Sequence, residues 1–213
     1  MAADFIRLTM LPIANMLRPY IKRVSGVENV PLSGSYIVAA NHASYMDHLI
    51  IQSIATRRLK RVVYFLAKKE HFQGIIQNAW HRYVGAIPID REKGGKKALE
   101  TASRFLKKGK VIGIYPEGTR TLNGKLQPAK TGVARLALKA MVPVVPVGLI
   151  GTFEILPKGK FIPGLKRAVV NIGKPMFFEE YYGKENNKKI LRLVTNKIMR
   201  QIAKLAKQRH DFR

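Results

Sequence analysis

The chain has 213 residues, no cysteine and a formal net charge of +26, from 39 Lys and Arg against 13 Asp and Glu. The length suits one domain with its own core, and the absence of cysteine excludes disulfides, thiolate metal sites and a cysteine nucleophile. So large a positive charge attracts polyanions, which include nucleic acid, anionic lipid and phosphorylated substrates. Nucleic acid is the least favoured of the three, because zinc-finger spacing, a basic zipper and an aromatic RNA-binding signature are all missing.

Residues 4–23 combine apolar positions at helical spacing with basic flanks. We expect an amphipathic helix here, kinked or split at Pro12, and we treat residues 1–23 as a segment distinct from a domain formed by residues 24–213. Such a helix suits an anionic membrane interface, and packing on the domain's own core is the alternative. Neither a signal peptide nor a run of about 18 apolar residues is found. We therefore expect peripheral or monotopic membrane contact, at the cytoplasmic face.

Short apolar runs alternate with helical patterns along the rest of the chain. The runs predicted as strands are residues 36–40, 62–67, 85–89, 111–115, 143–150 and 168–172. The patterns predicted as helices are residues 48–58, 96–108, 130–140 and 185–208, the last of them strongly basic. This alternation predicts an α/β fold, a single domain with a central mixed, largely parallel sheet flanked by helices.

His42 and Asp47 lie in the polar turn that follows the first of these strands. Chemistry in an open α/β sheet is usually placed at the carboxyl ends of the strands, and the turn can fold the Asp47 carboxylate back against the imidazole. One ring nitrogen would then donate to Asp47 while the other accepts a proton, which makes His42 a candidate general base. As a bare pattern, a His and an Asp five residues apart can also arise by chance.

Charged residues follow three further strands: Lys68 with Lys69, Arg91, and Glu117 with Arg120. If these strands are parallel, the charged groups gather at the edge that carries His42. They could there bind a phosphorylated substrate and orient its hydroxyl toward the base. The alternatives are lysines that are simply solvated and a Glu117 that braces the turn at Gly118.

Four sequence blocks occur in order: NHASYMD at residues 41–47, GAIPIDR at 85–91, YPEGTR at 115–120 and VPVVPV at 142–147. Together they resemble the blocks of the glycerolipid acyltransferases, the 1-acylglycerol-3-phosphate acyltransferase group, and the resemblance runs from about residue 25 to about residue 175. Asn41 and Ser44 are block members that we expect to shape the turn. Tyr115 stands where Phe is commoner in the family, a change expected to matter little.

The resemblance implies transfer of an acyl chain from a thioester of coenzyme A or acyl carrier protein to the free hydroxyl of lysophosphatidic acid, giving phosphatidic acid without a permanently bound cofactor. It also implies roles for individual residues. His42 would be the base, Asp47 would orient it, and the glycerol phosphate would be bound by Arg91, Glu117, Gly118, Thr119 and Arg120.

The expected partners are thus lysophosphatidic acid, an anionic membrane surface and, for one of the two donors, acyl carrier protein. Two other interpretations stay open. The acceptor could be glycerol-3-phosphate or another lysolipid, or the chain could be a non-catalytic basic module that binds anionic membrane or nucleic acid.

Overall fold

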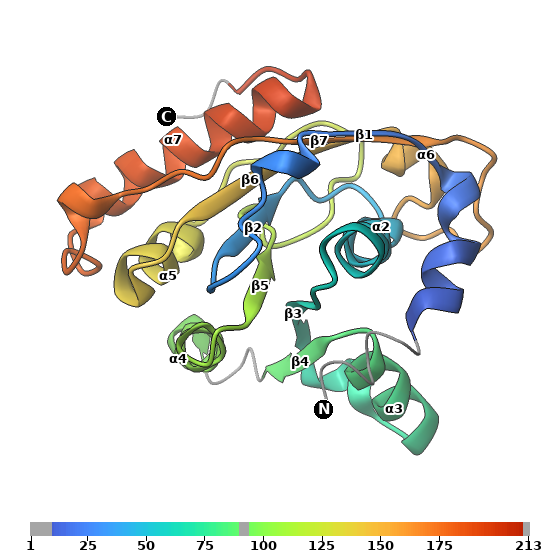
Figure 1. Ribbon diagram of the computed structural model, residues 1–213, viewed down its shortest axis with the longest axis horizontal. Coiled ribbons are helices and arrows are strands. Elements are labelled where there is room, and N and C mark those ends of the chain that lie inside the picture. Colours follow the sequence, from blue (N-terminus) through green and yellow to red (C-terminus); the bar gives the residue numbers. More distant parts are fainter. Residues whose placement is uncertain (1–9, 90–93, 211–213) are drawn as a thin grey trace.

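A computed structural model describes residues 10–89 and 94–210 (Figure 1). Within these residues, seven strands form one sheet in the order β1-β7-β6-β2-β5-β3-β4. Their bounds are β1 Ile21–Ser25, β2 Ile37–Ala40, β3 Val63–Lys68, β4 Ala86–Ile89, β5 Val111–Ile114, β6 Val144–Ile150 and β7 Ala168–Ile172. Every neighbouring pair is parallel except β6 with β7. The predicted α/β fold with a mixed, largely parallel sheet is confirmed.

Helices cover both faces of this sheet. Their bounds are α2 Met46–Ile54, α3 Ile75–Tyr83, α4 Gly94–Lys107, α5 Gly132–Ala140, α6 Thr152–Ile155 and α7 Lys188–Ala206. Short 3-10 turns occur at η1 Arg18–Tyr20, η2 Val27–Asn29, η4 Lys69–Phe72 and η5 Glu179–Tyr181, and a π-helical turn, η3 Ala55–Leu59, follows α2. One buried cluster joins the sheet to α4, α5 and α7, and a second joins the opposite face to α2 (Figure 1).

Burial on both faces explains why the central strands are continuous apolar runs rather than alternating patterns. All four residues of β2 are buried, as are the first three of β5. The helices instead bury one stripe each. In α4 this stripe includes Ala98, Ala102 and Leu106, while Lys96 and Lys97 face solvent. The layers therefore hold the carboxyl ends of β2, β3 and β5 at one edge of the sheet.

The N-terminal segment differs from the helix expected over residues 4–23. Residues 10–16 are helical, but residues 21–23 belong to β1 and pair with β7. Two β-branched residues within β1, Ile21 and Val24, favour this strand, and the proline-containing turn η1 ends the helix before it.

The helix over residues 10–16 packs on the domain itself. Met10 is buried, and the hydroxyl of Ser53 in α2 donates to the carbonyl oxygen of Ala14 at 2.9 Å. This is the alternative arrangement expected for the segment. The remaining part of it, residues 4–9, lies outside the described residues, and its membrane contact stays a prediction. None of the helices in the described ranges is long and apolar enough to cross a bilayer.

Candidate active site

The turn after β2 is shaped by the side chains of Asn41 and Ser44. Buried Asn41 bonds both backbone groups of Leu149 in β6, donating to its oxygen at 3.0 Å and accepting from its nitrogen at 2.8 Å. This side chain continues the β2–β6 ladder while the main chain turns away. The Ser44 hydroxyl donates to the Leu156 oxygen at 2.8 Å and accepts from the Met46 nitrogen at 3.0 Å, at the start of α2. The turn is therefore fixed from both sides, as expected of these two residues.

His42 and Asp47 lie in direct contact, with 2.8 Å between Nδ1 and Oδ2. The same oxygen of Asp47 accepts from the backbone nitrogens of Ala43 at 2.7 Å and Ser44 at 2.8 Å. Asp47 is fully buried in the first turn of α2, where the helix dipole also favours a carboxylate. Because Oδ2 accepts from both backbone N–H groups, Nδ1 is the donor in the His42–Asp47 contact and Nε2 is left as the acceptor. The His42 side chain is 18% exposed, which leaves it accessible to a substrate.

Two aromatic rings extend the imidazole into a stack across three strands. The His42 ring lies 3.8 Å from the Tyr115 ring at an angle of 8°, and Tyr115 lies 5.5 Å from Phe65 at 16°. Gly113 makes this possible, because a Cβ at that position would overlap the Phe65 ring. Burial raises the pKa of the Tyr115 phenol well above its ordinary value, so the ring stays neutral. The stack holds the imidazole plane in one orientation.

Glu117 is buried and braces the backbone at His42. One carboxylate oxygen accepts from the His42 nitrogen at 2.7 Å, and the other accepts from the backbone nitrogen of Gln127 at 2.9 Å. The Thr121 nitrogen donates to the His42 oxygen at 2.9 Å, so the third block and the residue directly after it hold both backbone groups of His42. Burial raises the pKa of Glu117 to about 7, although its N–H donors oppose the shift. These contacts support a bracing role for Glu117 rather than substrate contact.

The rest of the third block surrounds the turn. Gly118 has a φ of +74°, which permits the tight bend, and Thr119 is exposed. The Arg120 guanidinium carbon lies 3.3 Å from the centroid of the Tyr45 ring, so this arginine is beside the His42 turn. Its Nη1 is buried without a hydrogen-bond acceptor among the residues that the structure describes.

For the other predicted substrate-binding residues, the structure gives only the position of the backbone or no position. Lys68 ends β3 and Lys69 begins η4, so their backbones lie at the same edge as His42. Arg91 falls outside the described residues, and its role stays a prediction.

Reasoning from the sequence missed one titratable neighbour, His48. Its ring meets Phe65 edge-on with 6.2 Å between centroids. Burial is the main cause that lowers its pKa to about 4. The Asp47 carboxylate opposes this shift, and the charges of His42, His81 and Arg120 add to it. His48 is therefore neutral at pH 7. Its position directly after Asp47 was the only signal in the sequence.

The chain is similar to known acyltransferases. A family model described as Acyltransferase matches residues 22–150. The 1-acyl-sn-glycerol-3-phosphate acyltransferase of Bacillus subtilis (strain 168) is 30% identical over 155 residues, which cover 69% of this chain and 75% of that protein. The alpha form from Homo sapiens is 31% identical over 145 residues, 67% of this chain, and the match spans 50% of the human protein.

A solved structure agrees with the sequence matches. The crystal structure of the 1-acyl-sn-glycerophosphate (LPA) acyltransferase, PlsC, from Thermotoga maritima has a TM-score of 0.73 at 26% identity, covering 98% of this chain and 81% of that one. Since the family model covers more than half of the sequence and the fold agrees over nearly all of it, the chain belongs to the acyltransferase family.

Proposed function

We propose that this protein transfers a fatty acyl chain from an acyl thioester to the free hydroxyl of 1-acyl-glycerol-3-phosphate, giving phosphatidic acid. The observation that carries the proposal is the contact of 2.8 Å between the accessible His42 and the buried Asp47. The curated relatives from B. subtilis and human are named for this reaction.

The geometry supports direct attack with His42 as general base. Nε2 takes the proton of the acceptor hydroxyl while the hydroxyl oxygen bonds to the thioester carbonyl carbon. The resulting tetrahedral intermediate collapses, the carbon–sulfur bond breaks, and the imidazolium returns its proton to the leaving sulfur. Asp47 stabilises the imidazolium throughout. No acyl-enzyme is needed, which fits a chain without cysteine.

Arg120 is the residue best placed to bind the acceptor phosphate. Its buried Nη1 has no acceptor among the described residues, and an unsatisfied buried donor costs about 1–3 kcal/mol. A phosphate oxygen would satisfy it and form a charge-assisted bond. Arg91, Lys68 and Lys69 are predicted to add positive charge at the same edge.

The proposal also includes the acyl donor and the location of the protein at a membrane. Both coenzyme A and acyl carrier protein are anionic donors, and both suit a chain with a net charge of +26. The same charge suits an anionic membrane surface, where each Lys or Arg contributes about 1 kcal/mol. We place the enzyme at the cytoplasmic face of a membrane as a peripheral protein that needs no permanently bound cofactor.

Purified protein incubated with lysophosphatidic acid and an acyl thioester should release free thiol and form phosphatidic acid. His42→Ala should abolish both, while circular dichroism and thermal unfolding show that the fold is retained. A fully active His42→Ala variant would refute the mechanism. The same assay with acyl-coenzyme A and acyl-carrier-protein donors identifies the donor.

An acceptor panel separates the remaining alternatives. Arg120→Ala should raise KM for lysophosphatidic acid while leaving KM unchanged for lysolipids without a phosphomonoester. A basic module without catalytic activity would instead show no turnover with any thioester, and salt-sensitive binding indifferent to Asp47→Ala.

A further inference from the structure

An exposed apolar loop, residues 157–167, joins α6 to β7. Its three large apolar side chains are almost wholly in solvent, since Phe161 is 88%, Ile162 is 85% and Leu165 is 97% exposed. The loop is closed at its base, where the Gly164 nitrogen donates to the Ile155 oxygen at 2.7 Å. Neighbouring exposed apolar side chains on a closed loop typically mark a contact surface.

Cations flank the apolar side chains of loop 157–167. Lys158 and Lys160 precede them, Lys166 and Arg167 follow, and all four are exposed. Among the described residues, no carboxylate forms an ion pair with any of these four. Apolar side chains bordered by unpaired cations match the chemistry of an anionic bilayer interface.

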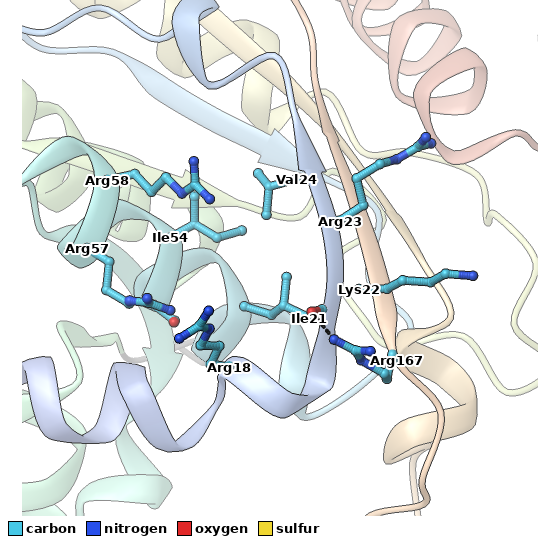
Figure 2. A pocket seen from close by; sticks show the side chains of 10 residues that line it. Arg18, Ile21, Lys22, Arg23, Val24, Ile54, Arg57, Arg58 and Arg167 are labelled. Carbon is cyan, nitrogen blue, oxygen red and sulfur yellow. Dashed lines mark hydrogen bonds between the residues drawn. The ribbon is translucent and has the colours of Figure 1, made fainter.

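A cavity of about 420 Å³ lies beside the base of this loop, and we call it the arginine pocket (Figure 2). Its lining residues are Arg18, Ile21, Lys22, Arg23, Val24, Ser53, Ile54, Arg57, Arg58 and Arg167. The lining therefore contains six cations, three aliphatic residues and no carboxylate. Arg167 belongs to both the loop and the pocket, and its guanidinium donates to the Ile21 oxygen at 3.0 Å.

The arrangement of the arginine pocket suits an anion that carries an apolar part. In Figure 2, Arg18 and Arg57 point toward one another, with Ile21 of β1 next to them. Ile54 lies between this pair and Arg58, whereas Lys22 and Arg23 extend away on the other side of β1. Convergent guanidinium groups repel one another unless an anion lies between them, and planar guanidinium groups bind phosphate oxygens in pairs. The neighbouring aliphatic surface can contact the glycerol and upper acyl region of a lipid.

We propose that loop 157–167 and the arginine pocket together form a docking surface for an anionic phospholipid bilayer. Phe161, Ile162 and Leu165 enter the interface, and the arginine pocket binds the phosphate of a lipid headgroup. Nucleic acid would satisfy the cations but would leave the three apolar side chains without a matching partner, and an acidic protein is separated from a bilayer by the experiments below.

This surface also connects to the active site, and the connection rests on the proposed function. Leu156, the residue before the loop, accepts hydrogen bonds from the Ser44 hydroxyl at 2.8 Å and the Tyr45 nitrogen at 3.2 Å. Docking through the loop therefore holds the His42 turn close to the bilayer. An acceptor and a product that are both lipids would then exchange over a short path.

The first experiment measures cosedimentation of the full chain with vesicles, in the absence of substrates. Phe161→Ser/Ile162→Ser/Leu165→Ser should weaken binding by about tenfold or more, because burial of three large apolar side chains is lost. Leu32→Ser/Met141→Ser is the matched control. These residues are 80% and 60% exposed and precede β2 and β6, at the opposite edge of the sheet from His42. The control should bind like wild type.

The second experiment compares vesicles of phosphatidylcholine alone with vesicles that also contain phosphatidylglycerol. Arg57→Gln/Arg58→Gln should lose about tenfold in affinity on the anionic vesicles and little on the neutral ones. Lys107→Gln/Lys108→Gln removes equal charge from the carboxyl end of α4 and serves as its control. It should bind anionic vesicles more tightly than the Arg57→Gln/Arg58→Gln variant.

Three results would overturn the docking surface. The first is that the Phe161→Ser/Ile162→Ser/Leu165→Ser variant binds vesicles like wild type. The second is that the Arg57→Gln/Arg58→Gln and Lys107→Gln/Lys108→Gln variants lose the same affinity. The third is that the loop variant and the Arg57→Gln/Arg58→Gln variant bind vesicles normally but no longer bind acidic carrier protein. Acyl transfer is assayed separately with detergent-dispersed lysophosphatidic acid. If wild type shows no acyltransferase activity but the test variants, and not their controls, lose vesicle binding, the docking surface is supported. Only the proposed function is then refuted.

Discussion

At the scale of single residues, one carboxylate oxygen of Asp47 accepts three hydrogen bonds. Oδ2 accepts from His42, Ala43 and Ser44, whereas buried Oδ1 has no partner among the described residues. In Asp47→Asn the amide oxygen can occupy the Oδ2 position, which keeps all three contacts and removes the charge. Because the imidazolium then lacks its counter-charge, we expect kcat to fall by about 10²–10⁴-fold with the fold intact.

Steady-state kinetics with lysophosphatidic acid, together with thermal unfolding, test this expectation. A change in KM alone would show that Asp47 acts on substrate binding rather than on the base. Full activity of Asp47→Asn would show that its charge has no catalytic role.

The buried carboxyl of Glu117 makes the free energy of unfolding depend on pH. Burial raises its pKa from 4.5 to about 7 in the folded protein. Between these values the folded state binds more protons than the unfolded state, so the stabilisation is complete below pH 4.5 and is lost as pH rises through about 7. We expect the free energy of unfolding to fall by about 3 kcal/mol over that range, because each pKa unit of difference corresponds to about 1.4 kcal/mol.

Urea unfolding at a series of pH values measures the Glu117 contribution. Glu117→Gln should flatten the loss of stability between pH 4.5 and 7. It should also be less stable than wild type at low pH, because one amide oxygen cannot serve both His42 and Gln127. Parallel pH profiles for wild type and variant would contradict the assignment.

The sequence predicts the local part of the site and misses the part that depends on strand register. His42 and Asp47 are five residues apart, so a turn is enough to join them. Tyr115 and Phe65 reach the imidazole only because β2, β5 and β3 are neighbours in a particular register, with a glycine at position 113. A linear pattern contains none of that information, so the stack of His42, Tyr115 and Phe65 could not be predicted from it.

At the scale of elements, the packing of α7 on β6 depends on Gly148. A Cβ at this position would overlap the backbone of Leu205 and Ala206 in α7. We expect Gly148→Ala to destabilise the protein by about 1–3 kcal/mol, since neither the helix backbone nor the buried strand can move freely. Gly95→Ala in α4 is the control, because nothing lies within 4 Å of its Cβ.

The control should be neutral or stabilising by up to about 1 kcal/mol, as expected for Ala replacing Gly in an exposed helix position. Differential scanning calorimetry of both variants measures the difference. Equal melting temperatures would mean that α7 shifts without cost.

The central elements were predictable because their apolar patterns are strong. The runs that became β2, β3, β5 and β6 are buried on both faces, and α4 and α7 show clear apolar stripes. The outer strand β1 and the direction of its neighbour β7 were not predictable, whereas the other outer strand, β4, was. The β1 strand lies within a segment with helical spacing, and the antiparallel direction of β7 depends on the path of loop 157–167. Helix α3 was not predicted, although Ile75, Ile76 and Trp80 recur at helical spacing. Their stripe does not pack on the core, with Ile75 90% and Ile76 84% exposed.

At the scale of the whole molecule, the positive charge is distributed over elements that have different tasks. Arg120 lies beside the His42 turn, the arginine pocket lies between η1 and η3, and α4 and α7 carry cations on their solvent faces. Such a field can gather anionic donors, lipid and acceptor at once. Its cost is self-repulsion in the folded state.

This self-repulsion predicts how stability responds to salt. With 39 Lys and Arg against 13 Asp and Glu, screening relieves more repulsion than attraction. We expect the melting temperature to rise by several degrees as sodium chloride increases from about 0.01 M to about 0.5 M, where the screening length becomes shorter than about 5 Å. Lys96→Gln/Lys97→Gln/Lys107→Gln removes three cations of α4 and should reduce the slope, whereas the uncharged change Gly95→Ala should leave it unaltered. A melting temperature that falls with added salt would show that attraction between cations and carboxylates outweighs repulsion among the cations. The cations would then be paired within the folded protein rather than available to bind an anionic ligand.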